Sequence, residues 1–174
     1  MILDSVYTAI FRPFQIRFPT QAAITIGLLA VLVGALNAAG TTNSGVGGVI
    51  GFTLLFLFAG TLGWYWFAAS VNLTAQLLGG RGNGRATLEG TAWGLWPLIF
   101  TGVAIAAANW SIIIGQLFFI AIAIGVVITL VVAIRQVHQF SWLKAILCLG
   151  LTLMMSVLAL SGLFLWPLMI VLGT

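Results

Sequence analysis

Long apolar runs separated by short polar or glycine-rich links form the pattern of this chain. Five runs are long enough to span a bilayer, because its hydrocarbon core is about 30 Å thick and a helix rises about 1.5 Å per residue. The predicted transmembrane helices cover residues 22–39, 48–78, 88–107, 112–134 and 143–172. We therefore expect an all-α membrane protein in which residues 20–174 form a single domain, a bundle of five transmembrane helices.

Composition points to lipid as the solvent of this bundle. Of the 174 residues, 62% are hydrophobic and 5% are charged. A soluble domain of this size needs a charged surface, which six basic and two acidic side chains cannot supply. Residues 1–4 lack the basic start of a cleaved signal peptide, so we expect the first apolar run to persist as an anchor.

The second run is too long for one perpendicular crossing and should tilt or project from the membrane. Its aromatic residues 64–66 lie roughly 25 Å from the start of the run, at the depth where aromatic rings prefer the headgroup boundary. Asn72 and Gln76 would then lie in the headgroups or in water.

All lysine and arginine residues fall on one side of the five-span arrangement. They are Arg12 and Arg17 before the first span, Arg81 and Arg85 between the second and third, and Arg135 and Lys144 beside the last link. The links on the other side carry no charge. The positive-inside rule therefore predicts a cytoplasmic N-terminus and an external C-terminus.

Residues 1–19 form a cytoplasmic amphipathic segment ahead of the first span. Apolar side chains alternate there with Asp4, Thr8, Arg12 and other polar residues, which is typical of a helix lying on the membrane surface. Pro13 and Pro19 predict that this interfacial helix is short.

The stretch GGRGNGR at residues 79–85 is the most motif-like part of the chain outside the spans. Glycine amides could cradle a phosphate, but no strand precedes them and no lysine followed by Ser or Thr completes a phosphate loop. A tight cytoplasmic turn fits better, with a partner-docking loop as a further alternative. We expect contacts to anionic headgroups or a partner protein from Arg81, Arg85, Arg135 and Lys144.

Glu89 follows Arg85 by four residues, in what the span boundaries make the first turn of the third helix. The favoured interpretation is a structural pair between Arg85 and Glu89. A proton-coupled transport role for Glu89 would need further carboxylates, and Asp4 is the only other acid in the sequence.

Catalytic, metal-binding and cofactor-binding sites are not expected. One histidine and two acids cannot form a conventional hydrolytic or zinc site. His138 is expected in a cytoplasmic loop with its imidazole in water or among headgroups, and Cys148 is expected to be a buried, inert thiol. We expect no nucleic-acid partner. Glycines spaced by four, at 47 and 51 and at 90 and 94, favour helix packing within the chain over a dimer interface.

Two short segments resemble the Yip1 domain family of five-span membrane proteins. The first is the second span running into residues 77–82, LLGGRG, followed by Thr87, Leu88 and Pro97; the second comprises Val137, His138, Ser141 and Ala145. The resemblance extends from about residue 18 onward. Departures are Gly84, near where the family usually has an aromatic residue, and Gln139, which replaces its usual glycine.

Because only a short segment precedes the first span, the resemblance is to the minimal prokaryotic members of the family. It implies a protein of the prokaryotic cytoplasmic (inner) membrane without a defined biochemical role. The Rab-linked trafficking role of eukaryotic members depends on a larger cytosolic region and is not carried over.

Two functions remain in competition. The first is a non-enzymatic scaffold or accessory subunit that packs against other membrane proteins, against itself, or organises lipid. The alternative is a small channel or transporter, which usually needs a polar lining. The candidates for such a lining fall mostly at span ends: Asn37, Asn72, Gln76, Asn109 and Gln116.

Overall fold

The computed structural model describes residues 20–40 and 46–172, and every regular element among them is helical. The elements are α2 (Thr20–Gly40), α3 (Val46–Leu77), α4 (Gly84–Gly94), the 3-10 helix η2 (Trp96–Phe100), α5 (Thr101–Trp110), α6 (Ile112–His138) and α7 (Trp142–Leu172). The predicted interfacial helix, with Arg12 and Arg17, lies outside the described residues.

Four helical segments within the described residues are long and apolar enough to cross a membrane. They are Val46–Leu77, Gly84–Trp110, Ile112–His138 and Trp142–Ala159, and α2 adds a shorter apolar helix over Ile24–Leu36. The prediction of an all-α membrane protein with five apolar helical segments is thus confirmed.

The third predicted span is not one straight helix. Asn83 begins it earlier than predicted, because its side-chain oxygen accepts a hydrogen bond from the Ala86 amide at 2.8 Å and caps α4. Pro97 then interrupts it, since proline has no amide hydrogen and its ring clashes with the preceding turn. The segment therefore consists of α4, the short η2 and α5.

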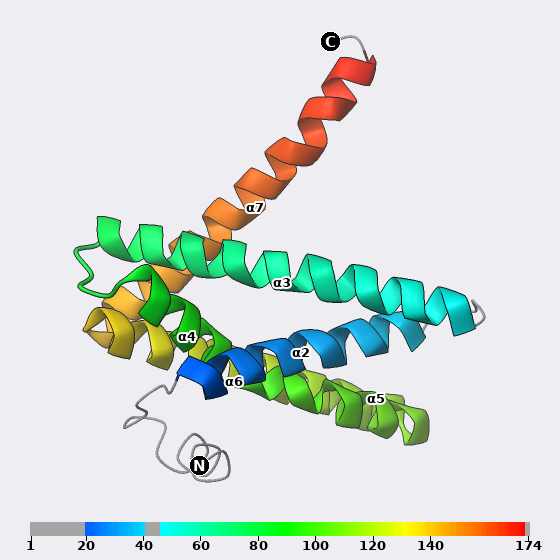
Figure 1. The fold of residues 1–174 in the computed structure, drawn as a ribbon. Helices are drawn as coiled ribbons and strands as arrows, with labels where there is room; N and C mark the ends of the chain where they lie inside the picture. Colours follow the sequence, from blue (N-terminus) through cyan, green and yellow to red (C-terminus); the bar gives the residue numbers. More distant parts are fainter. Residues whose placement is uncertain (1–19, 41–45, 173–174) are drawn as a thin grey trace.

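The helices run back and forth, so that their links gather at two ends of the molecule. Figure 1 shows the α3–α4 loop and the α6–α7 turn at one end, and the α5–α6 turn at the other. α2 packs along α3, and α5 packs along α6. The later part of α7 extends away from the other helices (Figure 1).

The main core lies where α3, α6 and α7 meet, close to the end that carries the α3–α4 loop. Its buried members are Val71, Ala75, Leu130, Val131, Ile134, Phe140, Ala145, Cys148 and Leu149. Cys148 is a free, buried thiol in this core, as expected. The larger group of buried residues therefore lies at this end, and a smaller one surrounds Trp64, Ala92 and Trp93.

Both α3 and α6 end at this end of the molecule with a residue in the left-handed backbone conformation. After α3 that residue is Gly79, with a φ of 81°, and the Gly80 amide donates to the Ala75 carbonyl at 2.8 Å. After α6 it is Gln139, with a φ of 55°, and the Phe140 amide donates to the Arg135 carbonyl at 3.0 Å. Glycine adopts this conformation without steric cost, which explains why a glycine suits position 139 better than glutamine.

Replacing Gln139 with glycine should therefore stabilise the protein. The left-handed conformation costs a non-glycine residue about 1–2 kcal/mol, and the greater freedom of glycine in the unfolded chain offsets part of the gain. We expect a net increase in unfolding free energy of up to about 1 kcal/mol, measured as a higher Tm in detergent. The matched control is Gly79→Ala, because an added methyl there meets open space while the backbone keeps its positive φ. This variant should have a lower Tm. An unchanged or lower Tm for Gln139→Gly would contradict a conformational cost at position 139.

Candidate functional site

The α3–α4 loop and the α6–α7 turn, far apart in the sequence, lie against each other and form the candidate site. The Arg81 amide donates to the His138 carbonyl at 3.4 Å, which joins the two links directly. Both segments that carry the resemblance to a known family therefore belong to one structural unit. We call this unit the two-turn end, comprising residues 78–87 and 135–144.

His138 is buried at the centre of the two-turn end, with 1% of its surface exposed. The expectation of a solvated or headgroup-facing imidazole was wrong. The reason is that α6 continues past its predicted end to His138, where the glycine loop and α4 cover the ring. The imidazole also stacks on Phe140, with ring centroids 5.7 Å apart.

The glycines at 80 and 82 allow the loop backbone to approach the imidazole. A methyl group added at Gly80 would lie 2.8 Å from the His138 Nδ1 atom, and one at Gly82 would lie 2.7 Å from it. Any larger residue would push the loop off the ring. The glycine-rich stretch therefore serves close packing against His138, which is a different use from cradling a phosphate.

Thr87 links three helices through its hydroxyl. Its Oγ1 atom lies 3.0 Å from His138 Nε2, 3.2 Å from the Asn72 amide oxygen and 2.9 Å from the Asn83 carbonyl oxygen. A hydroxyl has one proton to donate, and both other oxygens can only accept. The arrangement therefore favours an imidazole that carries its proton on Nε2 and donates it to Thr87.

This assignment leaves His138 Nδ1 as a buried acceptor, and it has no hydrogen-bond partner among the described residues. A buried acceptor without a partner is less costly than a buried N–H without one. Asn72 is half-buried in this cluster, and its expected position in the headgroups or in water stays a prediction. The polar groups here hold α3, α4 and α6 together.

The hydroxyl and imidazole pair resembles a nucleophile beside a base, but its surroundings do not suit catalysis. Thr87 and His138 are 2% and 1% exposed, so both groups are enclosed by the protein in this structure. No group of three His, Cys, Asp or Glu side chains that could hold a metal ion gathers in the described part of the chain.

The four basic residues predicted to contact headgroups or a partner all lie at the two-turn end, in different settings. Arg81 and Lys144 are exposed. Arg85 is exposed over 76% of its side chain. Arg135 is half-buried, with its guanidinium 4.7 Å from the centre of the Trp142 ring. Its charge therefore makes a cation–π contact within the protein.

Arg85 and Glu89 form an ion pair on α4, with 3.1 Å between the Arg85 Nε and Glu89 Oε1 atoms. The Glu89 side chain is only 12% exposed. Because α4 begins at Gly84, Glu89 lies in its second turn, and its prediction as a first-turn acid was wrong. The helix dipole therefore stabilises the Glu89 carboxylate less than the neighbouring Arg85 does, four residues earlier on the same face of α4.

Sequence reasoning missed a second contact of α4, between Thr91 and Trp64. The Trp64 indole nitrogen donates to the Thr91 hydroxyl at 3.2 Å, and Trp64 is 4% exposed. Trp64 is therefore buried within the protein, whereas Tyr65 and Trp66 beside it are exposed; the predicted depth of these residues in the membrane stays a prediction. Thr87 and Thr91 are four residues apart, and that spacing could have indicated a polar face of α4 turned toward its neighbours.

The two glycine pairs behave differently. A methyl added at Gly90 would lie 2.8 Å from Val137, and one at Gly94 would lie 2.9 Å from the Leu130 Cγ atom, so α4 packs closely on α6. Gly47 and Gly51 on α3 face open space. Of these two pairs, only the glycines at 90 and 94 allow close packing of helices within the chain.

Comparison with known proteins supports the family resemblance carried by the two segments that meet at the two-turn end. The family model described as Yip1 domain matches residues 8–171, nearly the whole chain. The comparisons with curated proteins and with solved structures gave no match.

Thr87→Val should destabilise the protein, because it keeps the side-chain shape but removes the partner of a buried imidazole. Leaving a buried polar group without its hydrogen bond costs about 1–3 kcal/mol. The measurement is thermal unfolding of the purified protein in detergent. Thr61→Val is the matched control, since the Thr61 hydroxyl donates to the Leu57 carbonyl of its own helix, and Thr87→Ser should restore part of the loss. Equal Tm values for Thr87→Val and Thr61→Val would refute the role of Thr87.

Proposed function

Because the chain belongs to the Yip1 domain family of membrane proteins, we propose that it is a non-enzymatic scaffold or accessory subunit. It packs against other membrane proteins or organises lipid, and its two-turn end meets anionic headgroups at the cytoplasmic surface. The membrane is the cytoplasmic membrane of a prokaryote, as for the minimal members that the sequence resembles.

One observation carries this proposal: the polar groups of the two-turn end bind one another, while the basic side chains face outward around them. His138, Thr87 and Asn72 are engaged in joining helices. Arg81, Arg85 and Lys144 remain exposed on the outside of the same unit. A rigid end that displays positive charge suits docking at an anionic surface.

The apolar faces of the bundle support a role in packing against neighbours. Leu54, Leu55 and Phe58 on α3 are 59–65% exposed, and the first turns of α6 are similarly apolar and exposed. Such apolar faces can pack against lipid chains or against the helices of another membrane protein.

A channel or transporter has less support from the arrangement of polar residues. Asn109 and Gln116 lie near the α5–α6 turn, whereas Asn72 and Gln76 lie near the end of α3. These side chains therefore fall into two groups at opposite ends of the molecule (Figure 1). They do not form a continuous lining.

The orientation proposed here has a cytoplasmic two-turn end and an external C-terminus. The basic residues of both links gather at one end, as the positive-inside rule requires. A reporter that is active only outside the cytoplasm should be active when fused after Thr174 and silent when inserted between Arg81 and Arg85. Activity of the reporter in the arginine loop would reverse the orientation.

Removal of the two loop arginines should weaken the preference for anionic lipid. Each basic residue near an anionic surface contributes about 1 kcal/mol, so Arg81→Ala combined with Arg85→Ala should cost about 2 kcal/mol at low salt and less at high salt. The measurement is energy transfer from the protein's tryptophans to labelled phosphatidylglycerol, present as a minor lipid in neutral vesicles.

Glu89→Gln is the control for the arginine experiment. It disturbs the ion pair with Arg85 but retains both positive charges, so the preference for phosphatidylglycerol should stay the same or increase. A loss in the double variant that does not respond to salt, or an equal loss in Glu89→Gln, would show that these residues act through the fold rather than through their charge.

A further inference from the structure

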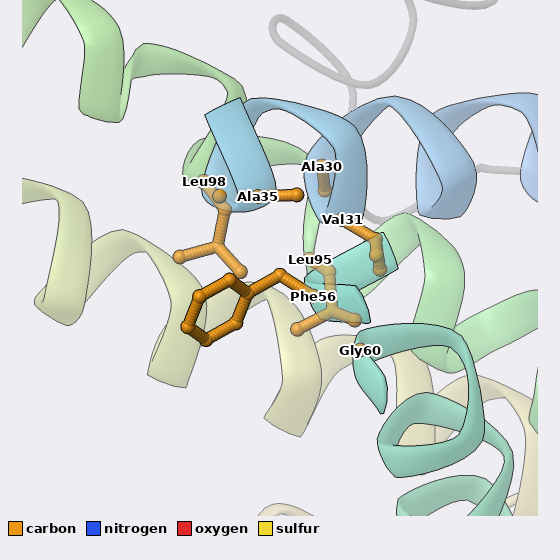
Figure 2. A pocket seen from close by; sticks show the side chains of 8 residues that line it. Ala30, Val31, Ala35, Phe56, Gly60, Leu95 and Leu98 are labelled. Atoms are coloured by element: carbon orange, nitrogen blue, oxygen red, sulfur yellow. The ribbon is translucent and has the colours of Figure 1, made fainter. Parts of the chain in front are cut away.

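An apolar pocket of about 270 Å³ opens between α2, α3 and the break in the third crossing. Figure 2 shows side chains from these segments converging on it. Its lining includes Ala30 and Gly34 from α2, Phe56 and Gly60 from α3, and Leu95 and Leu98 at the break.

The pocket arises from two features of the sequence. Pro97 interrupts the helix, and the irregular segment around it brings Leu95 and Leu98 to the pocket wall. Small residues on α2 and α3 leave space opposite them. Gly60 lets Val31 pack closely, since a methyl there would lie 2.7 Å from the Val31 Cγ1 atom, whereas a methyl at Gly34 would meet no atom within 4 Å.

The depth of the pocket restricts what can occupy it. Ala30 and Gly34 are 10 and 14 residues from the start of α2, which places them about 15–21 Å along that helix. In a hydrocarbon core about 30 Å thick, this is the middle region, which headgroups do not reach. We therefore expect an apolar occupant that enters from within the bilayer.

The size and lining of the pocket also favour an apolar chain. A cavity of about 150 Å³ lined by apolar side chains stays dry and can hold a molecule the size of benzene. This pocket is larger, and its lining residues are all apolar. If it were empty, the surrounding side chains would lose dispersion contacts that a chain of methylene groups can restore.

We propose that this pocket binds the distal part of a membrane-lipid acyl chain, which fills the gap at the break between α4 and α5. The bound chain packs against Phe56 and Leu98 and substitutes for the continuous helix that Pro97 prevents. This site lies away from the basic side chains of the two-turn end and is independent of the docking role proposed for them.

The experiment uses the full chain reconstituted in phosphatidylglycerol vesicles. The probe is a phosphatidylglycerol that carries a photoreactive diazirine near the end of one acyl chain, and the labelled residues are mapped by mass spectrometry. We expect label to be enriched on residues 30–35 and 95–98 relative to the exposed phenylalanines 118 and 119 of α6, which serve as a lipid-facing reference.

Gly34→Leu tests the pocket directly, because its side chain extends into the open space of the wall. It should abolish the enrichment at residues 95–98. Gly63→Leu is the matched control: Gly63 also faces open space on a helix but does not line the pocket, so the enrichment should remain. Leu98→Ala enlarges the pocket and should retain label on residues 30–35. It therefore tests whether the loss in Gly34→Leu comes from filling the pocket rather than from any substitution in its wall.

Three results would overturn the proposal. One is equal labelling of the pocket and of the α6 reference in the unmodified protein, which indicates contact with bulk lipid only. Another is equal enrichment in Gly34→Leu and the unmodified protein. The third is cross-linking of the pocket residues to a second copy of the chain in place of lipid, which would identify another protomer as the occupant.

Discussion

The contact between the Thr87 hydroxyl and the His138 imidazole is the interaction on which the two-turn end depends. It joins α4 to α6, and through Asn72 it extends to α3. The imidazole can be buried there because Gly80 and Gly82 let backbone pack directly on its ring. Burial without the hydroxyl would leave a polar ring without its partner, and larger residues in the loop would remove the space for it.

This arrangement divides the molecule into two parts with different properties. At the two-turn end, a hydrogen-bonded cluster, a dense core and two left-handed helix caps fix the geometry on which the basic side chains are displayed. Toward the other end, the helices present apolar faces, and Pro97 divides the third crossing so that a pocket opens beside it. The exposed basic side chains and the exposed apolar helix faces therefore lie on different parts of the molecule.

Two buried side chains were not anticipated from the sequence, for the same reason. His138 was assigned to a solvated loop, and the burial of Trp64 was missed, because the pattern around each residue was judged along the chain alone. In the structure, both bind threonines of α4. A polar side chain near the end of an apolar run can be paired within the protein as readily as it can be solvated, and the local pattern is the same in both cases.

The sequence by itself determined the fold class and the number of apolar helical segments, because crossing a membrane imposes a length and a polarity that can be recognised in a linear pattern. The short turn segments were also sufficient to indicate the family. Tertiary structure alone decided that these segments meet, since the pairing of Arg81 and Thr87 with His138 joins residues more than fifty positions apart. It also decided where the pocket opens, because helices arranged around a proline break leave a gap that depends on how they pack in three dimensions, and this packing is not encoded in any one stretch of the chain.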